Sequence, residues 1–148
     1  MDVLDLFHRY RDDVYRLAVN YTHSPQEAED VCQSVFLKLL QQPELTPGKE
    51  KAWLMQVTAN ACRDLLRSSW WRHTVPLEEA GDLAGAQRDE TIVLLRRLPP
   101  KYRVVLYLHY YEQYTTSEIG QLLKIPGGTV STRLSRGREQ LKRMMQEG

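Results

Sequence analysis

The stretch of sequence that decides the fold is residues 115–145, which read TTSEIGQLLKIPGGTVSTRLSRGREQLKRMM. It opens on a capping box, in which Thr115 caps a helix and Glu118 stands three residues further on. The Ile125–Gly128 segment predicts a tight turn, and a second helix is expected over Thr129–Met145. A short capped helix, a glycine turn and a second helix together predict a helix-turn-helix.

The second helix of such a motif enters the major groove of DNA with its N-terminal part. Hydroxyl and guanidinium groups in that part can donate to base edges and to phosphates. Side chains of these kinds mark the predicted DNA-reading face: Thr129, Ser131, Thr132, Arg133, Ser135, Arg136 and Arg138. The competing interpretation is a solvated charged helix, which the capping box, the glycine turn and the hydroxyl-rich start disfavour.

Helical periodicity extends over most of the preceding chain. Apolar residues recur at intervals of three and four, and the apolar stripes assigned to the core include Leu4, Val14, Val35, Leu40 and Ala52. The predicted helices cover residues 3–21, 25 to about 40, 50 to about 69, 89–98 and 100 to about 112. Ser24 is predicted to cap the second of them, because Pro25 suits the first position of a helix. No segment alternates with period two over a useful length, so we predict an all-α fold.

Residues 74–88 differ from their surroundings. They contain Pro76, Gly81 and Gly85 with little periodicity, which is typical of a flexible linker between two domains. We therefore predict a helical domain in residues 1–73 and a second one, with the helix-turn-helix, in residues 89–148.

Charge is distributed unevenly, although the whole chain carries a formal net charge of only +1. Residues 1–30 hold seven acidic and three basic side chains, whereas residues 120–148 hold six basic and two acidic ones. The first segment suits a basic protein surface and the last suits phosphate.

Several classes of function find no support in the sequence. The four histidines are scattered, and we find no metal-ligand spacing, phosphate loop or nucleophile–base pair, so we expect no enzyme activity, metal or cofactor. Cys32 and Cys62 fall within apolar helical patterns and are interpreted as buried thiols. No apolar run approaches the roughly 18 residues of a membrane span, and no secretory signal opens the chain, so we expect a cytoplasmic protein without membrane insertion.

Four strings in order along nearly the whole chain resemble bacterial RNA polymerase sigma factors of the sigma-70 family, extracytoplasmic-function group. Residues 28–37 (AEDVCQSVFL) resemble region 2.2, and residues 53–67 resemble regions 2.3 and 2.4. Residues 98–106 (LPPKYRVVL) resemble region 4.1, and residues 118–141 resemble region 4.2. The chain departs from the family pattern at Ser131, where a basic residue is usual, at Ser135, and at Gly137, where alanine is common.

The resemblance implies a protein that binds core RNA polymerase and directs it to promoter DNA, reading the −35 element with the helix-turn-helix. An anti-sigma factor is the further partner that the family suggests. The resemblance places four residues on the surface that docks on a coiled coil of the largest polymerase subunit: Glu29, Asp30, Gln33 and Phe36.

The first domain is expected, by the same resemblance, to read the −10 element as a separated strand. Asn60 matches the family position implicated in holding a flipped base, and Arg63 and Arg67 are expected to bind the −10 DNA with it. The loop Gln42–Lys49 would form the other wall of that pocket.

Two other classes of function stay open from the residues alone. A stand-alone helix-turn-helix regulator would bind duplex DNA by itself, usually as a dimer on half-sites one turn apart. A helical adaptor that binds only proteins would use the acidic helix and the tyrosines. Trp70 and Trp71 fit either base stacking or packing at an interface, and we favour packing.

Overall fold

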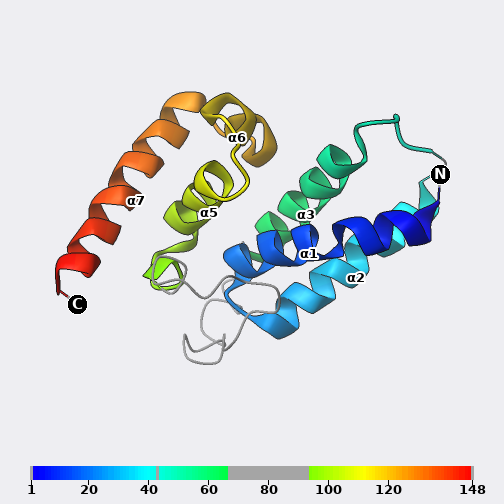
Figure 1. Cartoon of the computed structure of the whole chain (residues 1–148), viewed down its shortest axis with the longest axis horizontal. Coiled ribbons are helices and arrows are strands. Elements are labelled where there is room, and N and C mark those ends of the chain that lie inside the picture. Colours follow the sequence, from blue (N-terminus) through cyan, green and yellow to red (C-terminus); the bar gives the residue numbers. More distant parts are fainter. Residues whose placement is uncertain (1, 43, 67–93, 148) are drawn as a thin grey trace. The chain divides into compact units, whose positions relative to one another are not determined.

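Two groups of helices make up the chain, one within residues 1–85 and the other within residues 86–148. A computed structural model describes residues 2–42, 44–66 and 94–147 (Figure 1). Those ranges hold six helices and no strand, which confirms the predicted all-α fold. The predicted linker 74–88 lies outside the described residues, as do Arg67, Trp70 and Trp71.

The first unit is built on α1 (Val3–Thr22), which packs against both α2 (Pro25–Gln41) and α3 (Glu50–Leu66) (Figure 1). The Ser24 hydroxyl begins α2 by accepting a hydrogen bond from the Glu27 amide at 3.2 Å, as the sequence predicted. Buried apolar side chains from all three helices form the core, including Val14, Leu17, Ala18, Val35, Leu39, Leu54, Ala59 and Cys62.

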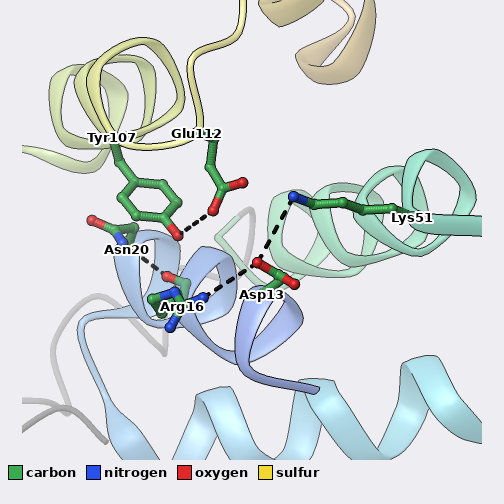
Figure 2. A network of polar contacts seen from close by, with 6 residues as sticks. All are labelled: Asp13, Arg16, Asn20, Lys51, Tyr107 and Glu112. Carbon is green, nitrogen blue, oxygen red and sulfur yellow. Dashed lines mark hydrogen bonds and ion pairs between the residues drawn. The ribbon is translucent and has the colours of Figure 1, made fainter. Parts of the chain in front are cut away.

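Asp13 joins α1 to α3 at the edge of this core (Figure 2). Its Oδ1 lies 3.3 Å from the Arg16 guanidinium on the same helix and 3.8 Å from Lys51 Nζ on α3. The Asn20 amide donates to the Arg16 carbonyl at 2.8 Å, one turn further along α1. The Asp13 side chain is only 20% exposed, so solvent screens this ion pair incompletely, and it holds the first turn of α3 against α1.

The second unit contains α5 (Pro100–Tyr110), α6 (Thr116–Leu123) and α7 (Gly127–Glu147), each in contact with the other two. Its core holds Leu98, Val105, Leu106, Leu108, Ile119, Leu122, Val130 and Leu134. The Tyr107 hydroxyl donates to the Glu112 carboxylate at 2.9 Å and so fastens the loop that follows α5 (Figure 2).

Arg103 is a buried cation of this unit. It is 3% exposed, and its guanidinium donates to the Leu98 carbonyl at 2.8 Å, which ties the segment before α5 to the helix. Removal from water disfavours the charged form, so burial lowers the pKa of Arg103 to about 10.

Four sequence-based details were wrong. Leu4 and Leu40 are 65% and 64% exposed, and Ala52 is exposed too, although all three were assigned to the core. Periodicity predicts a broad apolar stripe on a helix, but it does not show where the partner helix ends. Near the start of α1, Leu6 is buried instead of Leu4. The final helix begins at Gly127 rather than Thr129, so both glycines belong to its first turn.

Candidate nucleic-acid interface

The helix-turn-helix is held together at its turn. Thr115 and Glu118 form the predicted capping box, with each side chain accepting from the backbone amide of the other residue. Lys124 ends α6 in the left-handed conformation, with φ +59°, and its amide donates to the Gly120 carbonyl. A Cβ built on Gly120 would lie 2.9 Å from the Ile125 carbonyl oxygen, so the backbone passes too close for a side chain.

The two faces of α7 differ sharply. Val130, Leu134 and Gly137 are buried, and Gly137 lies where α7 crosses α5, because a Cβ there would meet Leu106 Cδ1 at 3.0 Å and Tyr102 Cβ at 3.2 Å. Four predicted DNA-reading residues, Ser131, Thr132, Ser135 and Arg136, are exposed, while Thr129 and Arg133 are half-buried at the edge of the exposed face.

Grooves run along both sides of the N-terminal half of α7. One, of about 430 Å³, lies between α7 and α6 and is lined by Thr116, Ser117, Gly120, Gln121, Ile125, Gly127 and Ser131. The other, of about 360 Å³, lies between α7 and α5 and is lined by Lys101, Tyr102, Gly128, Thr129, Thr132, Arg133 and Arg136. A helix flanked by two polar grooves suits a duplex whose two backbones pass on either side of the helix.

Lys101 is a basic residue of this interface that the sequence reasoning missed. It is exposed, and its ammonium lies 5.0 Å from the centre of the Tyr102 ring at the groove that Arg133 and Arg136 also line. Its position 32 residues before Arg133 gives no signal by spacing, because only the α5–α7 packing brings the two together. Residues 98–106, which resemble region 4.1, include Lys101, but the resemblance did not identify it as a DNA contact.

Arg138 is exposed but has a partner within the unit. Its guanidinium donates to the Tyr110 hydroxyl at the end of α5, over a distance of 3.0 Å. The contact links α7 to α5 and sets Arg138 apart from the exposed Arg136, for which the structure records no such bond.

A polar row runs along α3 in the first unit. Asn60 is half-buried, and its Oδ1 accepts from the Arg63 guanidinium at 2.7 Å and from the Gln56 amide at 3.1 Å. The structure therefore brings together Asn60 and Arg63, the two described residues that the resemblance assigns to the −10 element, and adds Gln56, which the sequence reasoning did not single out.

The predicted polymerase-facing residues of α2 fall into two kinds. Asp30 and Gln33 are exposed, whereas Glu29 is half-buried and paired with Arg11 of α1 at 3.2 Å. Phe36 is 7% exposed and meets the Phe7 ring edge-on, with 4.9 Å between ring centres.

An apolar groove of about 650 Å³ adjoins these residues and was not predicted. Its walls come from α1 and α2, and its lining residues are Val3, Leu4, Phe7, Gln33, Phe36, Leu37 and Leu40. Exposed leucines on both helices form its rim, which explains why Leu4 and Leu40 carry an apolar pattern without being buried. Contiguous exposed apolar surface of this kind is typical of a protein-binding site.

Cys32 and Cys62 are both buried with free thiols, as predicted. Burial raises the pKa of Cys32 to about 12 and raises that of Cys62 as well, so both thiols stay protonated at neutral pH. Within the described ranges, no group of three or more potential ligands could hold a metal ion. Among the same residues, no helix combines the length and apolar character needed to cross a membrane.

Comparison with known proteins assigns both units. The Sigma-70 region 2 family matches residues 6–72, and the Sigma-70, region 4 family matches residues 88–141. The ECF RNA polymerase sigma factor SigL of Mycobacterium tuberculosis is 30% identical over 96% of this chain and 88% of its own length. SigW of Bacillus subtilis, also an ECF RNA polymerase sigma factor, is 29% identical over 99% of this chain and 88% of its own length.

A solved structure shares the fold. It is the sigma factor RpoE from Bartonella quintana in complex with the anti-sigma factor NepR, with a TM-score of 0.73 at 19% identity, covering 95% of this chain and 94% of that one. This structure shows the fold, and the two family matches with the similarity to SigL decide the family. The chain belongs to the ECF RNA polymerase sigma factors of the sigma-70 family.

Proposed function

We propose that this sigma factor reads the −35 element with α7 and the unpaired −10 strand with α3, while α1 and α2 hold core RNA polymerase. One observation carries the −35 assignment: Ser131, Thr132, Ser135 and Arg136 are exposed on a helix whose other face is buried in its own unit. Hydroxyl and guanidinium donors in such a row can reach base edges in the major groove.

The edges of α7 suit the DNA backbone. Arg133 and Thr129 line the groove that also holds Lys101, so cationic and hydroxyl donors lie together where one strand would pass. Arg138 extends the basic surface, and its bond to Tyr110 makes it better suited to a phosphate than to a base edge.

In the first unit, we assign core polymerase binding to the exposed Asp30 and Gln33 and to the apolar groove beside them. Glu29 supports this surface through Arg11, and Phe36 forms its floor with Phe7. Acidic side chains next to exposed leucines suit a basic, amphipathic helical partner. The −10 strand is assigned to Asn60 and Arg63, with Arg67 as an expected neighbour outside the described residues.

The wider assignments follow from the family. We propose boundaries at 1–73, 74–88 and 89–148, which the family matches over 6–72 and 88–141 support. An anti-sigma factor is the expected regulatory partner, since the RpoE structure of similar fold holds one. The polymerase performs the chemistry, so we propose that this chain is not an enzyme and that it acts in the cytoplasm, where the polymerase meets the chromosome.

Dependence on core polymerase tests this proposal. The proposal assigns promoter contacts to both units, so specific binding should come from several contacts that polymerase joins. In a gel shift, the chain alone should bind a promoter fragment weakly, and the chain with core enzyme should bind it specifically. Tight binding to a palindromic site by the chain alone would instead establish the stand-alone regulator.

A pair of variants tests the role of α7. Arg133→Ala and Arg136→Ala should lower promoter-specific transcription in vitro and reduce the dependence of binding on salt, because cationic contacts to phosphate release counterions. Unchanged transcription in both variants would support the adaptor that binds only proteins.

A further inference from the structure

Two neighbouring side chains bind the carbonyl oxygen of the Asn60 side chain. Its Oδ1 accepts from Arg63, one turn ahead on α3, at 2.7 Å, and from Gln56, one turn behind, at 3.1 Å. Both donors belong to the same helix, so their spacing is fixed by the backbone rather than by a mobile loop. In the part of the chain that the structure describes, both hydrogen bonds of the Asn60 side chain end on this oxygen.

The chemistry of Arg63 determines which way the amide points. A guanidinium has donors and no acceptor, so the Asn60 atom beside it must be the carbonyl oxygen. Rotating the amide by half a turn would set its NH2 group against the guanidinium and lose the hydrogen bond. The group that remains available to a ligand is therefore Nδ2, with its two hydrogens.

We infer that Asn60 recognises a hydrogen-bond acceptor on an unpaired −10 base, and that Gln56 and Arg63 are positioning residues for it. This inference rests on the proposed placement of the −10 strand at α3. An asparagine with a free amide could read donors and acceptors alike, but one whose oxygen is already occupied offers donors only. A base that presents a ring nitrogen or a carbonyl oxygen at that point is then favoured over one that presents an amino group.

Arg63 then acts on Asn60 rather than on the DNA backbone. The sequence reasoning placed its charge directly on the DNA, whereas the structure shows the guanidinium donating to Asn60 at 2.7 Å. A positioning role and a phosphate contact differ in what they predict. Loss of a phosphate contact weakens binding to every sequence and lowers the salt dependence, whereas loss of positioning weakens discrimination at one base.

The experiment uses full-length chain with core polymerase and a pool of single-stranded oligonucleotides with a short randomised segment. The bound fraction is sequenced, which gives the preference for each base at each position. The wild-type chain should favour an acceptor-presenting base at one position by about tenfold, a usual value for one base-edge contact. Asn60→Ala should remove that preference, and Asn60→Asp, which keeps the oxygens but loses the donors, should move it toward a base with an amino group.

The outcomes separate the inference from the placement on which it rests. If Asn60→Ala leaves every preference unchanged, Asn60 does not meet the −10 base and the placement fails. If Asn60→Ala removes the preference but Asn60→Asp retains it, the placement stands and the donor assignment is overturned.

Variants of the neighbours test the positioning role. Arg63→Met and Gln56→Met should each reduce the single-base preference while leaving the salt dependence of binding unchanged, and Arg63→Lys should restore part of it because a donor returns. A uniform loss for all sequences in Arg63→Met, with a lower salt dependence, would make Arg63 a phosphate contact and overturn its positioning role. Circular dichroism of each variant checks that α3 remains folded.

Discussion

Replacement of Gly120 by alanine tests the close approach at the turn of the helix-turn-helix. The new Cβ would lie 2.9 Å from the Ile125 carbonyl oxygen, so the backbone must move by about half an ångström to reach ordinary contact. The Gly120 carbonyl accepts from the Lys124 and Ile125 amides, the latter at 3.0 Å, and that movement stretches both bonds.

Opposing contributions determine how much Gly120→Ala changes the free energy of unfolding of the second unit. Overpacking of this kind costs about 1–3 kcal/mol, and each weakened hydrogen bond costs up to about 1 kcal/mol more. Alanine is favoured over glycine within a helix by up to about 1 kcal/mol, which offsets part of the loss. We expect Gly120→Ala to destabilise the second unit by about 2 kcal/mol, which raises the opening equilibrium by about 30-fold.

Amide hydrogen exchange followed by mass spectrometry measures this effect locally. Exchange in α6 and α7 should become about 30-fold faster, while α2, in the other unit, serves as an internal reference. Gly128→Ala is the matched control, because nothing lies within 4 Å of a Cβ there, and it should cause no loss of protection. Protection of α6 in Gly120→Ala equal to or above that of the wild type would refute the steric argument.

Three further predictions concern other residues. Lys124→Gly should raise the melting temperature of the second unit, since a left-handed backbone costs a side-chain-bearing residue about 1 kcal/mol, and a lower melting temperature would contradict this reading. Lys101→Ala should lower the salt slope of holoenzyme binding to promoter DNA by about 0.9, while Lys142→Ala, far along α7, should leave the slope unchanged. The stability of the first unit should decline from about pH 9 toward pH 12 in alkaline urea titrations, because the unfolded thiols of Cys32 and Cys62 ionise in that range while the buried ones stay protonated. Fast alkylation of either thiol in the native protein at pH 8 would contradict the assigned burial.

Local signals in the sequence predicted most of the elements. The Ser24 and Thr115 caps lie where the sequence placed them, because a cap depends on residues within one turn of each other. Buried positions in the middle of helices were also predicted well, as Val14 and Val35 show. The DNA-reading residues of α7 were predicted from the helix-turn-helix pattern, whereas the −10 residues came from a family resemblance. The contacts of both sets with DNA stay predictions.

The rest could not be predicted because it depends on packing between segments far apart in the sequence. Leu4 and Leu40 have the spacing of core residues, yet they line an open groove whose lining, within the described residues, comes from α1 and α2 alone. Gly137 reads as a weak point in a helix, whereas the structure places it at the α5–α7 crossing, where a larger residue would press on Leu106. Lys101 and Gln56 could be singled out only once the structure showed their neighbours, which are Arg133 for Lys101 and Asn60 for Gln56.

The arrangement of the first unit also bears on how this protein can change by mutation. α1 packs against both α2, which we propose to face polymerase, and α3, which we propose to read the −10 bases, and Asp13 ties it to Lys51. On that proposal, a substitution inside α1 perturbs both tasks at once. Alleles in α1 should therefore be pleiotropic in a genetic screen, whereas alleles on the outer surfaces of α2 and α3 should separate the two phenotypes. New promoter preferences can then arise on α3 without loss of polymerase binding, provided that α1 stays constant.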